Sequence, residues 1–276
     1  MRIEVAGLSD CGNHRSQNDD YYCIGPFVEQ DVLTTFTLDS TSAHFQRYGL
    51  LAAVADGMGG YTGGALASKT VLDTFNALYH SEDRTGCTSN EFVECLQRYV
   101  TQTNSTLSRL LERSPELANA GTTIAGIAMM PPDILVIFHA GDSRVLRAAA
   151  GYVRQLTIDH TPLGSDVAAG RLTEEEAALQ PDSSRLTRVL GLVGDTRVDF
   201  QSETAWVPNN TFLIGTDGWH GIGRGLPRKA IQEKIRLGGN AETLVTRLLN
   251  DAITVDGHDN ATLVIVSITD GGTTNG

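Results

Sequence analysis

Short apolar runs separated by turn residues divide the chain into predicted strands. The run Leu50–Ala55 is nearly continuous in apolar character, which is typical of a strand in a protein interior. Pro131 to Asp133 and Gly151 each join two such runs, as in β-hairpins. The predicted strands are Ile3–Leu8, Tyr21–Ile24, Leu50–Ala55, Thr122–Met130, Ile134–His139, Val145–Ala149, Tyr152–Leu156, Val198–Ala205, Thr211–Gly215 and Ala261–Ile268.

Other segments repeat their apolar positions at helical spacing. In one of them Val71, Phe75 and Leu78 lie on a single helical face. The predicted helices are Ala65–His80, Asn90–Arg113 with Ser89 as N-cap, Pro227–Leu237 with proline in its first turn, and Ala241–Ile253. A short helix is predicted at Thr173–Leu179, where Thr173 and Glu176 form a capping box.

Two stretches have weaker patterns. Residues Val28–Tyr48 mix Thr, Ser and Asp with few apolar positions, which predicts a loop or an irregular hairpin. Residues Asp159–Arg185 are polar apart from the short helix. The tail, residues 269–276, is expected to be disordered.

The order of elements favours antiparallel sheets covered by helices. Strands lie at both ends of the chain, and helices come in groups instead of alternating singly with strands. No linker or internal repeat divides the chain, so residues 1–268 are predicted to form a single α+β domain.

Composition narrows the function classes. A formal net charge of −12 would repel a phosphate backbone, so nucleic-acid binding is not expected. The acidic excess is either a solubility feature or, locally, a site for divalent cations. The four cysteines lack CxxC spacing, which favours a reducing cytoplasm over a disulfide scaffold or a zinc site. We see neither a signal peptide nor a membrane-spanning apolar segment.

Four aspartates lie at the ends of predicted strands. Asp56 ends a strand and is followed by a run rich in glycine, Asp142 and Asp217 also follow strands, and Asp259 precedes one. Each aspartate taken alone fits a turn or a cap better than a metal ligand, but four in the same setting favour a shared site. Carboxylates at the ends of buried strands need partners, and no basic run is placed to pair them all. Oxygen-only ligands suit Mg²⁺ or Mn²⁺, and two such ions can activate a water for attack on phosphorus.

Five motifs follow one another along the chain: Arg15-x-x-Asn18-Asp19-Asp20, Val54-Ala55-Asp56-Gly57-Met58-Gly59-Gly60, Ala140-Gly141-Asp142-Ser143-Arg144, Gly215-Thr216-Asp217-Gly218 and His258-Asp259-Asn260-x-Thr262. In this order they resemble the motifs of the PPM family of metal-dependent Ser/Thr protein phosphatases, the protein phosphatase 2C group, in its bacterial form. Residues Thr187 to Gly191 also resemble the family's stretch after its flap.

The resemblance implies a four-layer α-β-β-α sandwich, with two stacked antiparallel sheets flanked by helices. It also implies that a water bridging two Mn²⁺ or Mg²⁺ ions hydrolyses phosphoserine and phosphothreonine in proteins, opposing a bacterial Ser/Thr kinase. We expect a cytoplasmic monomer. The residues that carry over are Arg15 for the substrate phosphate, Asp56 as the bridge between the ions, the Gly57 carbonyl, Asp19, Asp20, Asp217 and Asp259 around them, and Asp142 with Asp217 at a third ion. Residues 159–185 correspond to the flap.

Some positions depart from the family pattern. Met58 stands where animal members carry a histidine taken as the general acid, so the proton donor is left open between a metal-bound water and a nearby histidine, His14 or His258. Asp19 stands where many members have Glu or Gln. Two other hypotheses stay open: a non-catalytic phosphoprotein-binding regulator with the same fold, and a hydrolase of small phosphoesters.

Overall fold

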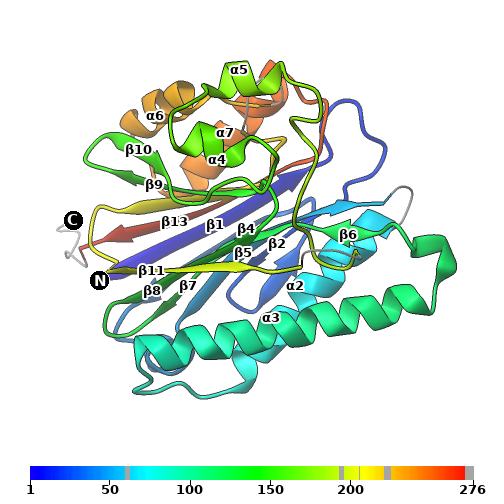
Figure 1. The fold of residues 1–276 in the computed structure, drawn as a ribbon. Helices are drawn as coiled ribbons and strands as arrows, with labels where there is room; N and C mark the ends of the chain where they lie inside the picture. Colours follow the sequence, from blue (N-terminus) through cyan, green and yellow to red (C-terminus); the bar gives the residue numbers. More distant parts are fainter. Residues whose placement is uncertain (60–62, 193–195, 205, 221–224, 271–276) are drawn as a thin grey trace.

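A computed structural model describes residues 1–59, 63–192, 196–204, 206–220 and 225–270 (Figure 1). Gly60 of the second motif, Ala205 of a predicted strand, and residues 271–276 of the predicted tail lie outside these ranges. Thr269, where the tail was predicted to begin, is the last residue of a strand.

Two antiparallel sheets form the centre of the molecule (Figure 1). The first has the order β10 (Tyr152–Gln155), β9 (Arg144–Ala149), β12 (Thr211–Gly215), β13 (Ala261–Thr269), β1 (Arg2–Asp10) and β4 (Leu33–Asp39). The second has the order β11 (Asp199–Thr204), β8 (Ile134–Ala140), β7 (Ile124–Met130), β5 (Leu50–Met58), β2 (Asp20–Ile24) and β3 (Phe27–Glu29), and β6 (Gly121–Thr122) pairs with the end of β5.

Helices cover the outer face of each sheet. Helix α2 (Gly63–Ser81) contacts β5 and β2 and packs against α3 (Ser89–Glu112), while α7 (Ala241–Val255) contacts β13 and β1 and packs against α6 (Arg228–Arg236). The shorter helices are α1 (Ala43–Tyr48), α4 (Gly164–Ala168), α5 (Glu174–Ala178) and a 3₁₀ turn at Pro115–Leu117. The predicted four-layer α+β sandwich is confirmed.

The apolar runs of the sequence match three apolar layers. In β5, Leu50 and Val54 face the other sheet, whereas Leu51 and Ala53 face the α2 and α3 layer. Because successive side chains of a strand point to opposite faces, a strand buried on both faces needs a continuous apolar run. The layer beneath α6 and α7 is built in the same way, with Ile265 of β13 packed towards the helices.

Two local predictions were wrong. Residues Val28–Tyr48 form neither a loop nor a hairpin, since β3 pairs with β2 in one sheet, β4 pairs with β1 in the other, and α1 follows. Helix α3 is capped by Thr88 instead of Ser89, because the Thr88 hydroxyl accepts from the Glu91 amide and the Glu91 carboxylate accepts from the Thr88 amide.

Strand register brings the acidic strand ends to one edge of the two sheets. Asp20, the first residue of β2, is directly opposite Asp56 near the end of β5. Gly215, the last residue of β12, pairs with Leu263 near the start of β13. Antiparallel pairing therefore places residues that leave one strand beside residues that enter the next.

Candidate metal centre

Three of the predicted ligands converge at this edge. One carboxylate oxygen from each of Asp56, Asp142 and Asp217 lies within 4.8 Å of the other two. Asp56 is inside β5, whereas Asp142 follows β8 and Asp217 follows β12. Oxygens at this spacing match the separation of ligands around one hard divalent cation.

The electrostatics of Asp56 and Asp142 favour a bound cation. Burial, followed by the charges of Asp20, Asp217 and the other acids, raises the pKa of Asp56 well above its ordinary value. Burial and the charge of Asp217 do the same for the pKa of Asp142. In the described part of the chain, neither Asp56 nor Asp142 forms an ion pair with lysine or arginine. Two neighbouring, partly buried carboxylates, Asp56 and Asp142, without a basic partner among the described residues fit a divalent cation.

Asp20 lies beside the cluster and is held from the other sheet. Its Oδ2 accepts hydrogen bonds from the hydroxyls of Thr216, at 2.7 Å, and Thr262, at 2.8 Å. Its Oδ1 is buried and has no hydrogen-bond partner among the described residues. Burial raises the pKa of Asp20 to about 8, although the two threonine hydroxyls lower it. The unpartnered oxygen, in a cluster of acids, fits a cation or a cation-bound water.

Asp19 and the Gly57 carbonyl face each other at the start of α2. A Cβ atom on Gly64 would lie 2.8 Å from both Asp19 Oδ2 and the Gly57 carbonyl oxygen, so both oxygens approach the same point. Asp19 Oδ1 accepts from the Ala65 amide at 3.1 Å. Burial raises the pKa of Asp19, while the charge of Arg15 lowers it. The glycine at position 64 leaves space for these oxygens, and they fit a second cation.

Arg15 projects from the loop between β1 and β2. Its Nη2 lies 2.8 Å from Asp259 Oδ1, and its side chain is 55% exposed. Asp259 thus orients the guanidinium beside the cluster and leaves much of it open to solvent.

The two histidines considered as proton donors lie together. The rings of His14 and His258 stack at 4.1 Å between centroids with 9° between planes. His258 Nδ1 lies 2.5 Å from Asp256 Oδ1. His14 precedes Arg15 in the sequence and His258 precedes Asp259, and Arg15 and Asp259 form an ion pair. Both histidine side chains are exposed, so the stacked pair lies on the solvent side of that ion pair.

Several supporting residues were inside the motifs but had no predicted role. The Asn260 side chain accepts from the Asp19 amide at 2.8 Å and donates to the carbonyls of Cys11 and Gln17. The Thr123 hydroxyl, outside every motif, accepts from the Asp56 amide at 3.0 Å. The sequence alone gives no indication of this role for Thr123, because it depends on the pairing of β6 with the end of β5.

The polar segment 159–185 lines part of an open cavity that also includes Asp142 and Asp217. The cavity has a volume of about 560 Å³, and its lining includes Asp142, Asp217, Arg144, Leu163, Val167 and Ala177. Arg144 fastens this segment to β9, because Nη2 lies 2.7 Å from Asp159 Oδ2 and Nη1 lies 3.3 Å from Glu174 Oε2. The predicted capping box of α5, between Thr173 and Glu176, is confirmed.

The sequence profile of the family described as "Protein phosphatase 2C" matches residues 34–234. This chain belongs to the protein phosphatase 2C family. The family and the enzyme class that the motifs predicted, a protein phosphatase, are therefore confirmed. The profile match does not extend to Arg15, Asp19 or Asp259, which lie on either side of it.

Relatives of known structure and sequence span nearly the whole phosphatase 2C chain. The protein phosphatase PhpP of Streptococcus pneumoniae is 28% identical over 267 residues, covering 96% of this chain and 98% of PhpP. The structure of the Mycobacterium tuberculosis serine/threonine phosphatase PstP/Ppp matches with a TM-score of 0.77 and 27% identity, covering 98% of this chain and 100% of that one. The catalytic domain of PstP in complex with two manganese ions matches with a TM-score of 0.75 and 26% identity, over 98% of this chain and 100% of that one.

None of the helices in the described part of this phosphatase 2C chain combines the length and the apolar character needed to cross a bilayer.

Proposed function

We propose that the protein hydrolyses phosphoserine and phosphothreonine in proteins with the help of two Mn²⁺ or Mg²⁺ ions and a third at an adjoining site. The observation that carries the proposal is the convergence of partly buried carboxylates from both sheets, together with an exposed arginine paired to Asp259. Asp56 would bridge two ions. The other ligands would be Asp217 and Asp259 at one ion, the Gly57 carbonyl and Asp19 at the other, Asp142 with Asp217 at the third, and Asp20 as a support.

In this proposal, different residues of the chain bind the ions and the substrate phosphate. When bound, the ions offset the charge of the phosphate dianion and lower the pKa of a water that attacks phosphorus. The Arg15 guanidinium binds two phosphate oxygens, and its bond to Asp259 orients it. Asp20 Oδ2 accepts from the two threonine hydroxyls, and Oδ1 is buried without a hydrogen-bond partner among the described residues, so Oδ1 is the oxygen that would face an ion or its water.

The substrates in this proposal are phosphorylated proteins, including a Ser/Thr kinase and its targets, which the protein meets as a monomer in the cytoplasm. The names of two relatives, the serine/threonine phosphatase stp of Listeria innocua and the serine/threonine protein phosphatase PstP of Mycobacterium tuberculosis, support this substrate class. So does the cavity under the 159–185 segment, which opens beside Asp142 and Asp217 and leaves room for residues that flank the phosphorylated one.

The substrate class is tested with purified protein and Mn²⁺. A phosphothreonine peptide and a phosphoserine protein should release phosphate with kcat/KM at least about tenfold above that for p-nitrophenyl phosphate, because flanking residues contribute binding energy in the transition state. Phosphate release is measured with malachite green. Equal or higher efficiency on the small ester would favour the small-phosphoester hydrolase, and an inert protein would favour the non-catalytic regulator.

Arg15→Lys is expected to lower kcat/KM for the phosphothreonine peptide about tenfold, mainly through a higher KM. Lysine keeps the charge but loses the two parallel N–H donors that match a phosphate. Steady-state kinetics measure the effect. Arg2→Lys is the matched control, since Arg2 is 54% exposed and also pairs with a nearby acid, Glu4. Equal kinetics for the two variants would remove Arg15 from the phosphate site.

A further inference from the structure

A buried histidine outside the motifs holds the backbone of one proposed metal ligand. The amide of Gly141 donates to His160 Nδ1 at 3.2 Å, and the amide of His160 donates to the Gly141 carbonyl at 2.9 Å. Both peptide groups of Gly141 are thus bonded to one residue. Gly141 immediately precedes Asp142, so these bonds restrain the backbone that carries the Asp142 carboxylate.

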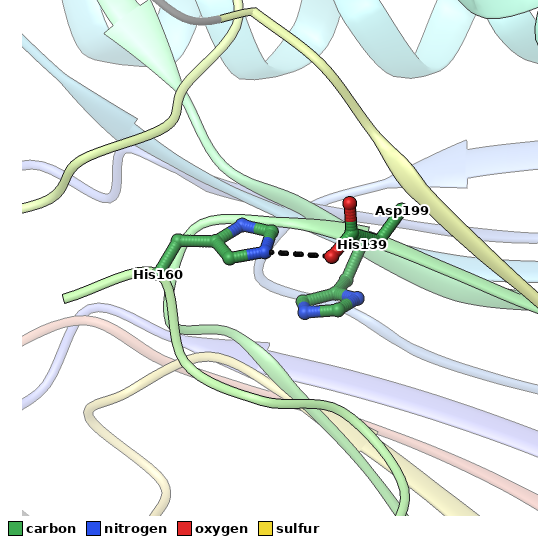
Figure 2. A group of neighbouring side chains, drawn as sticks. All are labelled: His139, His160 and Asp199. Carbon is green, nitrogen blue, oxygen red and sulfur yellow. Dashed lines mark hydrogen bonds and ion pairs between the residues drawn. The ribbon is translucent and has the colours of Figure 1, made fainter. Parts of the chain in front are cut away.

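His160 is itself fixed by a network at the start of β11 (Figure 2). Its Nε2 lies 3.2 Å from Asp199 Oδ2, and its ring stacks on His139 at 4.4 Å between centroids. The Arg188 Nη1 donates to the other Asp199 oxygen at 2.6 Å. Each of these groups comes from a different segment, so the imidazole is held on its edge and on its face.

The hydrogen bonds of His160 favour a hydrogen-bond network, and not a separate metal site, at His139, His160 and Asp199. The side chains of His139, His160 and Asp199 are close enough to hold an ion. However, His160 Nδ1 accepts from the Gly141 amide, which assigns the proton of the neutral ring to Nε2 and directs it to Asp199; Arg188 Nη1 also lies 3.2 Å from Nε2. A metal at Nε2 would require loss of that proton, and Arg188 already supplies the positive charge beside Asp199.

The other side of Asp142 is also held. The hydroxyl of Ser143 lies 2.7 Å from that of Thr123, and the same Thr123 oxygen accepts from the Asp56 amide. Gly141 has a φ of +108°, and a Cβ there would lie 2.5 Å from Thr123 Cγ2. The loop that carries Asp142 is therefore restrained before and after the ligand, by His160 and by Thr123.

We propose that His160 is a positioning residue for the third cation: by binding both peptide groups of Gly141, it directs the Asp142 carboxylate towards Asp56 and Asp217. The proposal rests on the proposed function, in which Asp142 is a ligand. It also connects the cation to the 159–185 segment. The carbonyl of His160 accepts from the Thr187 amide at 2.8 Å, so His160, near the start of that segment, connects Gly141 to the residues that follow the segment.

Two substitutions at position 160 test the hydrogen bonds of the two ring nitrogens one at a time. An asparagine oxygen at position 160 lies at the same number of bonds from the backbone as Nδ1, and a glutamine amide at the same number as Nε2. His160→Asn keeps an acceptor for the Gly141 amide, whereas His160→Gln keeps the bond to Asp199 and loses that acceptor. Both variants place a neutral amide in the same buried position.

The expected result is a difference between the two variants. His160→Gln should weaken the lowest-affinity class of Mn²⁺ site about 10- to 100-fold in calorimetric titration, as for other outer partners of metal ligands. In metal-free protein it should speed hydrogen exchange of peptides that contain Gly141. His160→Asn should stay within about threefold of the original protein in both measurements, because a neutral hydrogen bond of the same geometry is retained.

A double-mutant cycle with Asp142→Asn makes the inference specific. His160→Gln should have no further effect on Mn²⁺ binding once Asp142 is replaced. The inference is overturned if the two His160 variants behave alike, if the loss persists in the Asp142→Asn background, or if Zn²⁺ binds at a site that His139→Ala removes and Asp142→Asn retains. If Asp142→Asn alone leaves Mn²⁺ binding unchanged, the proposed ligand role of Asp142 fails first and this inference fails with it.

Discussion

Asp56→Asn is expected to lower kcat/KM for a phosphothreonine peptide at least about a thousandfold, equivalent to about 4 kcal/mol of transition-state stabilisation. Asp56 has the central place in the cluster: it is opposite Asp20 in the sheet, and its carboxylate converges with those of Asp142 and Asp217. Asparagine keeps the size of the side chain, but it replaces one carboxylate oxygen with an NH₂ group and removes the negative charge. A ligand that bridges two ions requires both oxygens and that charge.

The fold should survive this substitution. The backbone of Asp56 is held independently of its carboxylate, because its amide donates to the Thr123 hydroxyl and its carbonyl accepts from the Thr123 amide at 2.9 Å. Removing one of several converging charges should leave the melting temperature of metal-free protein equal or higher. Asp73→Asn is the control, since Asp73 is exposed on α2 and paired with Lys69. Activity of Asp56→Asn within about tenfold of the original would exclude a bridging role.

The sequence predicted the layers well because both sheets are buried on two faces. Strands such as β5 and β13 then need continuous apolar runs, and such runs are easy to recognise. Strand β4 escaped recognition because it is an edge strand, paired with β1, with alternate residues exposed along its whole length. Its sequence, LTTFTLD, carries β propensity in threonine and phenylalanine but little apolar continuity.

The positions of the acidic residues could also be predicted, whereas their partners could not. Asp56, Asp142, Asp217 and Asp259 are recognisable because each adjoins an apolar strand. The hydroxyls that hold Asp20 come from residues 196 and 242 positions away. Such long-range pairs depend on strand register, which a single sequence does not specify. The same holds for His160, whose bond to Gly141 exists only because the chain returns after β10 to the end of β8.

Withdrawal of metal with EDTA is expected to abolish phosphate release and to expose a pH dependence of stability. The pKa of Asp20 is raised by burial from its ordinary value of 3.8 to about 8, so between these pH values the folded protein binds a proton that the unfolded chain has released. The stabilisation is fully present below the unfolded pKa and is lost as pH rises through the folded one. Metal-free protein should therefore melt at progressively lower temperature as pH rises from about 5 to 8.

Thermal unfolding in EDTA across this range, compared with Asp20→Asn, isolates the contribution of Asp20. The variant has no titrating group at position 20, so its melting temperature should fall less steeply; one titrating group changes the free energy of unfolding by at most about 1.4 kcal/mol per pH unit. Adding Mn²⁺ to the original protein should raise its melting temperature most at the alkaline end, since cations and protons compete for the same carboxylates. Parallel curves for the two proteins would mean that Asp20 is not held protonated in the fold, and activity that persists in EDTA would exclude the metal-dependent reaction.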